Sequence, residues 1–230
     1  MALSEDLAGE VKNILATSWQ ERHGQKVPEA VDVRLGNDAV KLQATVLYAD
    51  LAESTNLVDK HKASFAAEVY KSYLHCASKI ISAEGGVITA FDGDRVMAVF
   101  IGKTKNTSAA RCALKINHAV VKIINPAIKA EYPKSEYTLK HSVGVDTSTL
   151  LVARTGIRGS NDLVWVGRAA NYAAKLCALR QSTYASYITA DVFKVMLEKV
   201  KSSSGRSIWE ATKWEEKGIT VYRSSWIWRP

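Results

Sequence analysis

The sequence predicts an α+β fold in which helices pack on a mixed β-sheet. Two observations support this prediction: apolar runs of strand type alternate with segments of helical periodicity, and glycine or Asp-Gly signals separate them. The expected strands and helices alternate along the chain, which ends in a hairpin. With 230 residues, 47% of them hydrophobic, the chain can bury a sizeable core.

Residues 1–40 are expected to form a helical extension, and residues 41–230 the main domain with its C-terminal hairpin. Apolar residues at helical spacing predict an amphipathic helix over 3–20, and a short strand is expected at 31–35. No apolar run approaches the roughly 20 residues that span a bilayer. The three cysteines show no paired spacing. We therefore expect a cytoplasmic protein with reduced cysteines and no membrane span.

Glycines and turn residues divide the main domain into the predicted elements. A buried strand over 41–50 precedes a long helix over 56–83, which ends before a glycine pair. We expect the helices to cover one face of the sheet. The other predicted elements are two strands within 87–101, a helix over 107–129, strands near 138–146, 149–155 and 162–166, a helix over 167–180, a strand at 187–189, a helix from Asp191 and a hairpin within 207–228.

Two carboxylates, Asp50 and Asp94, stand where predicted strands end. Asp50 follows a buried apolar run, where a carboxylate is costly unless something pairs with it. Asp94 lies in an Asp-Gly-Asp hairpin turn. If the two strands are neighbours, both acids reach one edge of the sheet and can share divalent cations. From these residues alone, a helix cap at Asp50 and a plain turn residue at Asp94 fit better, and Asp92 competes as the hairpin acid.

Three segments, taken together, resemble the catalytic domain of class III nucleotidyl cyclases over roughly residues 41–228. They are VLYADLAEST at 46–55, GGVITAFDGDRVMAVF at 85–100 and VWVGRAANYAAKLCAL at 164–179. The resemblance implies a ferredoxin-like palm that assembles head to tail into a homodimer. It also implies two Mn²⁺ or Mg²⁺ ions per active site, bound by Asp50 and Asp94 with help from the carbonyl of Leu51.

The third segment implies two catalytic residues on one helix. Asn171 is expected to orient the ribose, and Lys175 stands where the family has the arginine that stabilises the transition state. A spacing of four places both on one helix face, and in the family this helix comes from the partner subunit. Lysine keeps the charge of arginine but not its bidentate fork. Without the resemblance, both residues would fit an ordinary exposed helix face.

The residues placed to read the base do not suit a purine. Ala90 and Val164 occupy the positions that adenylyl cyclases use for adenine, and neither side chain can hydrogen-bond a base. Tyr48 shares a strand face with Asp50 and could stack on a smaller ring, while Arg95 could reach a base carbonyl or a phosphate. Core packing for Tyr48 and a solvated charge for Arg95 are equally open. The expected substrate contacts are Tyr48, Ala52, Ser54, Thr55, Ala90, Arg95 and Val164.

The chain resembles the pyrimidine (uridylate and cytidylate) cyclases of bacterial anti-phage Pycsar systems in its Ala-Glu-Ser-Thr loop and in lacking side chains that could read a purine. Another departure from the wider family is Glu53, where many members have glycine. The similarity implies that UTP or CTP becomes a 3′,5′-cyclic monophosphate, which acts on a separate cyclic-nucleotide-binding effector in antiviral defence. We favour UTP, because Arg95 or a tyrosine hydroxyl can donate to the carbonyl of uracil, whereas the amine of cytosine needs an acceptor. Cytidylate, adenylate and guanylate cyclases remain alternatives.

Two other classes of protein are open from the sequence. A catalytically silent, nucleotide-sensing dimer module would keep the fold, but the presence of both acids and Asn171 argues against it. A nucleic-acid-binding module fits the net charge of +8. However, the basic residues are scattered and form no stripe interleaved with aromatic residues. We therefore expect no nucleic-acid partner.

Overall fold

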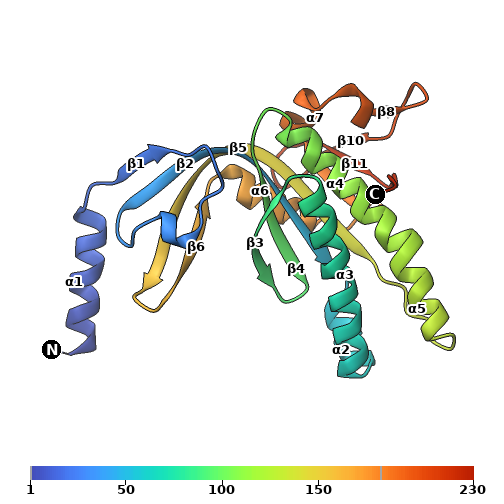
Figure 1. Cartoon of the computed structure of the whole chain (residues 1–230), viewed down its shortest axis with the longest axis horizontal. Coiled ribbons are helices and arrows are strands. Elements are labelled where there is room, and N and C mark those ends of the chain that lie inside the picture. The colour runs from blue at the N-terminus through green and yellow to red at the C-terminus, as the bar shows by residue number, and fades with distance from the viewer. Residues whose placement is uncertain (1, 182) are drawn as a thin grey trace. The chain divides into compact units, whose positions relative to one another are not determined.

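The structure, a computed structural model, describes residues 2–181 and 183–230 and divides the chain into two compact units. The larger unit holds residues 44–148 and 168–230, and the smaller one holds residues 1–43 and 149–167. Two long strands, β2 (Asp38–Leu51) and β5 (His141–Ile157), contribute residues to both units. The predicted α+β class is confirmed (Figure 1).

The larger unit contains a mixed sheet with the strand order β10-β11-β7-β5-β2-β4-β3. β4 pairs antiparallel with both β2 and β3, whereas β5 and β7 are parallel. The strands are β3 (Val87–Asp92), β4 (Arg95–Phe100), β7 (Ser186–Thr189), β10 (Glu210–Trp214) and β11 (Ile219–Ser224), with a small β8 (Ser202–Ser203) and β9 (Arg206–Ser207) hairpin beside them. The helices are α2 (Ser54–Lys60), α3 (Ala63–Ala83), α4 (Lys105–Ala119), the π-helical turn η2 (Val120–Ile124), α5 (Asn125–Glu131), α6 (Arg168–Cys177), α7 (Ala190–Val195) and the 3₁₀ turn η3 (Glu198–Val200).

The main core lies between one face of the sheet and helices α3 and α4. Alternate residues of β2, Leu47, Ala49 and Leu51, are buried there with Tyr73 of α3 and Leu114 of α4. Because side chains alternate along a strand, the residues between them face the other side of the sheet. This alternation decides which side chains can form a site at the end of β2.

The opposite face of the sheet is also covered by a helix, so the expectation of helices on one face only is wrong. Leu176 of α6 packs with Tyr187 of β7 and with the β10–β11 hairpin. The helix lies so close to β5 that a Cβ added at Gly144 would be 2.1 Å from the carbonyl oxygen of Ala173 and 2.4 Å from the amide nitrogen of Cys177. β5 therefore carries a buried face on each side, and its glycine permits the second one.

Several predicted elements differ from the structure. The helix expected over 56–83 is two helices, because Lys62 adopts an extended conformation between α2 and α3. The strands expected at 138–146 and 149–155 form the single strand β5. The strand expected at 31–35 is instead the 3₁₀ turn η1 (Ala30–Asp32), in which the carboxylate of Asp32 accepts a hydrogen bond from the backbone N–H of Glu29.

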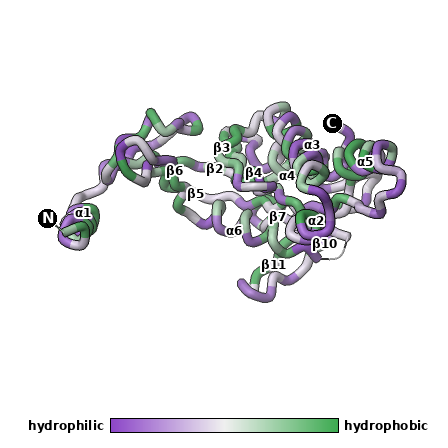
Figure 2. Tube along the Cα trace, turned by 90° about the horizontal axis from the view of Figure 1, so that it is seen from below, coloured by the Kyte–Doolittle hydropathy of each residue, from purple (hydrophilic) through white to green (hydrophobic). Residues whose placement is uncertain are grey.

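The smaller unit contains α1 (Leu3–Ala16), β1 (Gln20–His23) parallel to β2, and β6 (Ser160–Val166) antiparallel to β5. α1 ends four residues earlier than predicted, and the side-chain amide of Asn37 donates to the carbonyls of Ile14 and Thr17 at this end. No residue of α1 is buried, and Figure 2 shows hydrophobic positions along it. No helix of the described chain combines the length and apolar character needed to cross a membrane. The domain boundary expected at residue 40 stays a prediction.

We expect Gly144→Ala to destabilise the protein by about 1–3 kcal/mol, because the added methyl group would force α6 away from β5. Urea unfolding followed by circular dichroism measures this change. Gly9→Ala is the control, since a Cβ at Gly9 in α1 meets nothing within 4 Å. Equal losses of stability in the two variants would contradict the close α6–β5 contact.

Candidate active site

Asp50 lies near the end of β2, on the sheet face that α6 covers. Its neighbours Ala49 and Leu51 point into the main core, so the carboxylate points the other way. Nη2 of Arg180 donates a hydrogen bond to Oδ2 of Asp50 over 2.7 Å. Burial and the negative charge of Asp94 raise the pKa of Asp50, while Arg180 opposes this increase. The site therefore contains a carboxylate that is partly withdrawn from water and close to a second one.

Asp94 follows Gly93 in the turn between β3 and β4, and Gly93 has a φ of +59°, a conformation that favours glycine. The ladder between β2 and β4 pairs Ala49 with Val96, which brings this turn to the end of β2 that carries Asp50. Oδ2 of Asp94 is buried and has no hydrogen-bond partner among the described residues. The two carboxylates thus converge on one edge of the sheet.

The surroundings of Asp94 differ from those of Asp92, the other acid of the hairpin. Asp92 is exposed and forms an ion pair with Arg95 at 2.7 Å, whereas Oδ2 of Asp94 is buried and unpaired. An orphaned, buried carboxylate oxygen beside a second carboxylate with a raised pKa is an arrangement that a divalent cation relieves. The donor set of Asp50 and Asp94, with the carbonyl of Leu51 next in the chain, fits Mg²⁺ or Mn²⁺. No cluster of three or more His, Cys, Asp or Glu that could hold a metal ion occurs in the described ranges.

The loop after Asp50 turns sharply at Glu53. This residue has φ +61° and ψ +31°, a left-handed conformation, and its carboxylate faces Nζ of Lys140 at 3.4 Å. The position where the family often has glycine therefore keeps a glycine-like backbone here. The N–H of Ala52 already donates to the carbonyl of Lys140 at 2.9 Å, so it is not free for phosphate in this conformation. Ser54 and Thr55 form the first turn of α2.

The expected base-reading residues of the larger unit lie in one row across three strands. Met97 of β4 pairs with Tyr48 of β2 on one side and with Ala90 of β3 on the other. The guanidinium carbon of Arg95 lies 5.5 Å from the centroid of the Tyr48 ring, and burial raises the pKa of Tyr48. Arg95 is thus held between Asp92 and an aromatic ring. Val164 belongs to the smaller unit, where it is exposed on β6.

Helix α6 carries the two residues expected to act on ribose and phosphate. Asn171 and Lys175 are both exposed, and the ammonium group of Lys175 pairs with the carboxylate of Glu216 in the β10–β11 turn. Within one chain, the cation at Asp50 is therefore Arg180, not Lys175. Sequence reasoning missed Arg180, since it lies beyond the helix and outside the family motif. Only its side-chain contact identifies it.

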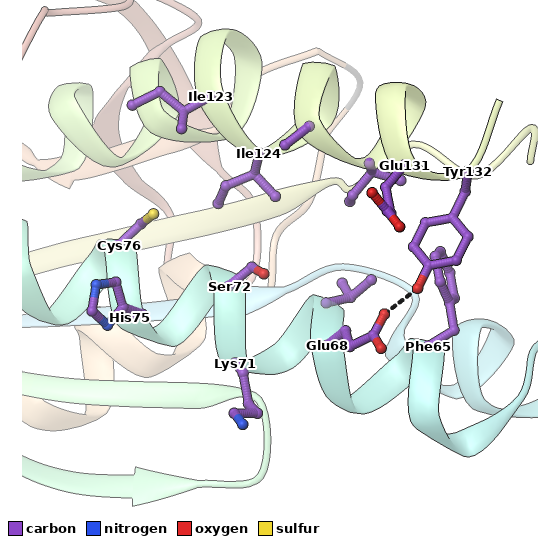
Figure 3. A pocket seen from close by; sticks show the side chains of 13 residues that line it. Phe65, Glu68, Lys71, Ser72, His75, Cys76, Ile123, Ile124, Glu131 and Tyr132 are labelled. Atoms are coloured by element: carbon purple, nitrogen blue, oxygen red, sulfur yellow. Dashed lines mark hydrogen bonds between the residues drawn. The ribbon is translucent and has the colours of Figure 1, made fainter.

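Two of the cavities lined by described residues of the larger unit bear on the site. One, of about 620 Å³, is mainly apolar and lies between α3 and the η2–α5 segment, where the hydroxyl of Tyr132 donates to Glu68 (Figure 3). Its lining contains none of the predicted site residues. The other, of about 650 Å³, is lined by Ala52, Glu53 and Arg180 among other residues. The second cavity therefore adjoins the loop that follows Asp50.

Buried His141, at the start of β5, gives a prediction on pH. Burial lowers the pKa of His141 to about 3 in the folded protein, whereas in the unfolded chain it is near 6.5. The unfolded state therefore binds more protons between these values, and stability falls as the pH decreases below about 6.5. Between pH 7.5 and pH 5, the free energy of unfolding of the native protein, measured with urea, should fall by about 2 kcal/mol more than that of His141→Leu. Equal losses would contradict a neutral, buried imidazole.

The left-handed backbone at Glu53 gives a second prediction. Glu53→Gly should be more stable than Glu53→Ala by about 1 kcal/mol, because alanine keeps the Cβ that disfavours this conformation. Both variants lose the same exposed ion pair with Lys140, so the comparison isolates the backbone. Thermal unfolding measures the difference. An alanine variant as stable as the glycine variant would show that the loop relaxes to another conformation.

Comparison with known proteins finds relatives that match this chain over almost its entire length. No protein-family model matches the chain. It is 52% identical over 231 residues to a uridylate cyclase of Xanthomonas perforans, a match that covers 100% of this chain and 99% of that protein. It is 51% identical over 230 residues to a uridylate cyclase of Burkholderia cepacia, with 99% of each covered.

Solved structures agree with this relationship. A bacterial light-regulated adenylyl cyclase aligns with a TM-score of 0.66 and 27% identity, over 79% of this chain and 89% of that one. The three segments that resemble a class III cyclase therefore lie in the corresponding fold. Because half of the residues are shared with the two bacterial relatives over almost the complete length of each, this chain belongs to the uridylate cyclase family of nucleotidyl cyclases.

Proposed function

We propose that this chain is a uridylate cyclase, which converts UTP to 3′,5′-cyclic UMP and pyrophosphate at a site built on Asp50 and Asp94. The convergence of these two carboxylates, one with an orphaned buried oxygen, is the observation that supports the proposal most strongly. The names of the two relatives that are about half identical to this chain support uracil as the base.

Asp50, Asp94 and the carbonyl of Leu51 would hold two Mn²⁺ or Mg²⁺ ions. When bound, such cations lower the pKa of a ribose 3′-hydroxyl and screen the charge on the leaving pyrophosphate. The chain positions the triphosphate with the first turn of α2, at Ser54 and Thr55, and with Ala52, two residues before this helix, once its N–H is released. These residues bind and orient, so the rate depends on positioning and electrostatics rather than on a covalent intermediate.

Asn171 and Lys175 would complete the site from a second copy of the chain. Both are exposed on α6, and Lys175 faces Glu216 rather than Asp50 within its own chain. A head-to-tail homodimer would place Asn171 at the ribose and Lys175 at the phosphate of the other protomer. Lys175 then neutralises charge that develops in the transition state.

Tyr48 and Arg95 would read the base. Tyr48 offers a ring for stacking, and Arg95, already held over that ring, offers donors for the carbonyl of uracil. The row formed with Met97 and Ala90 provides no polar partner for a purine, and Val164 provides none either. This arrangement favours UTP over CTP, because the cytosine amine would face donors.

The cellular role follows from the proposed product. We propose a cytoplasmic enzyme, which is consistent with three free cysteines, in which residues 41–230 form the catalytic domain and residues 1–40 an extension. Cyclic UMP would act on a separate effector with a cyclic-nucleotide-binding site, as part of anti-phage defence. Neither a nucleic acid nor a membrane is needed for this reaction.

Turnover with Mn²⁺ and each of UTP, CTP, ATP and GTP, with products identified by mass spectrometry, tests the proposal. We expect cyclic UMP from the native protein and a loss of at least about 100-fold in Asp50→Asn and Asp94→Asn, because each variant removes a charge that the cations need. Asp92→Asn is the matched control, because its carboxylate is exposed and paired with Arg95. Turnover retained in Asp94→Asn but lost in Asp92→Asn would reverse the assignment, and no cyclic product from any nucleotide would favour a silent sensor.

A further inference from the structure

Arg180 lies in the turn after α6 and occupies an oxygen of the proposed metal site. Its Nη2 is 2.7 Å from Oδ2 of Asp50, and the side chain of Asp50 is only 15% exposed. A cation of the same chain therefore holds a carboxylate that a divalent cation must also bind. Arg180 and the metal compete for this oxygen.

The turn that presents Arg180 is fixed from the core. Arg180 has a φ of +44°, a left-handed conformation that is unfavourable for a residue with a side chain. The N–H of Gln181 donates to the hydroxyl of Tyr187 at 2.7 Å, and this hydroxyl donates to the carbonyl of Gln181 at 3.2 Å. Because Tyr187 is fully buried, it anchors the turn directly after Arg180. Strained backbone of this kind persists where the surrounding structure holds it, often at functional sites.

The other cations near the site have carboxylate partners of their own. Lys175 pairs with Glu216, Arg95 with Asp92, and Lys140 with Glu53. The carboxylate partner of Arg180 is Asp50 itself. Binding of a metal ion at Asp50 would leave the guanidinium of Arg180 without this partner, and the carboxylates beside the other cations are already paired. A released guanidinium has a place to move, because Arg180 also lines the cavity of about 650 Å³ beside Ala52 and Glu53.

We propose that Arg180 is a triphosphate-binding residue that the divalent cation releases. In the nucleotide-free chain it neutralises Asp50. When the metal-bound nucleotide arrives, the guanidinium exchanges the carboxylate for phosphate oxygens, which its planar fork matches in a bidentate manner. This inference rests on the proposed role of Asp50 in metal binding. It assigns to a residue of the same protomer the bidentate contact that Lys175 cannot make.

The first test measures Mn²⁺ binding to the nucleotide-free protein by electron paramagnetic resonance of free Mn²⁺. Arg180→Gln should bind Mn²⁺ about three- to tenfold more tightly than the native protein, since the competing cation is gone. Arg206→Gln removes the same charge from the exposed strand β9 and should leave the affinity unchanged. An Arg180→Gln affinity that is equal to or weaker than the native value would overturn the proposal.

The second test measures nucleotide binding by calorimetry at saturating Mn²⁺, with the non-hydrolysable probe α,β-methylene UTP. Arg180→Gln should bind this probe about tenfold more weakly, because a charge-assisted contact to phosphate is lost. Uridine, which has no phosphate, should show no difference between the two proteins. Unchanged affinity for the triphosphate probe, or an equal loss for uridine, would also overturn the proposal.

A conservative variant keeps the test valid if Arg180→Gln does not fold. Arg180→Lys retains the charge without the fork, so its Mn²⁺ affinity should stay within about twofold of native while probe binding weakens several-fold. Native-like probe binding in this variant would contradict the bidentate contact. The outcome is separable from that of the proposed function: loss of Mn²⁺ binding in Asp50→Asn tests the metal site, and four-nucleotide turnover tests the reaction. Either can fail while the Arg180 comparisons still give a result.

Discussion

Two carboxylates that are partly removed from water and held at one edge of a sheet repel each other. The arrangement of positive charge in the rest of the site depends on this repulsion. Burial and the charge of Asp94 both raise the pKa of Asp50, and Oδ2 of Asp94 has no partner in the described chain. Positive charge must therefore be supplied. In the nucleotide-free chain Arg180 supplies it at Asp50, and under the proposed function divalent cations would take the place of Arg180.

The close contact of α6 with β5 decides where that positive charge is placed. Gly144 allows α6 to lie against β5. This contact brings the end of α6 and the following turn to the end of β2, where Asp50 lies. The same contact leaves Asn171 and Lys175 on the exposed side of the helix. The turn after α6 therefore contacts Asp50 of its own chain through Arg180, and under the proposed function the exposed pair on the helix would serve the site of a partner.

Two departures from the wider cyclase family become interpretable in the structure. Glu53 adopts a left-handed backbone conformation, which glycine adopts readily, and its carboxylate faces Lys140. Lys175, in the position of the family arginine, pairs with Glu216. In both departures the changed side chain forms an ion pair within its own chain.

The sequence by itself determined the family, the α+β class and the hairpin that carries Asp94, because each depends on a motif that is local in the chain. Only the tertiary structure showed that Asp92 and Asp94 differ in their surroundings, since Asp92 is exposed and paired with Arg95 whereas Oδ2 of Asp94 is buried. It alone placed α6 on the second face of the sheet and brought Arg180 to Asp50. The physical reason is that a contact between residues 130 positions apart depends on how a helix packs and where it ends, which no local pattern encodes.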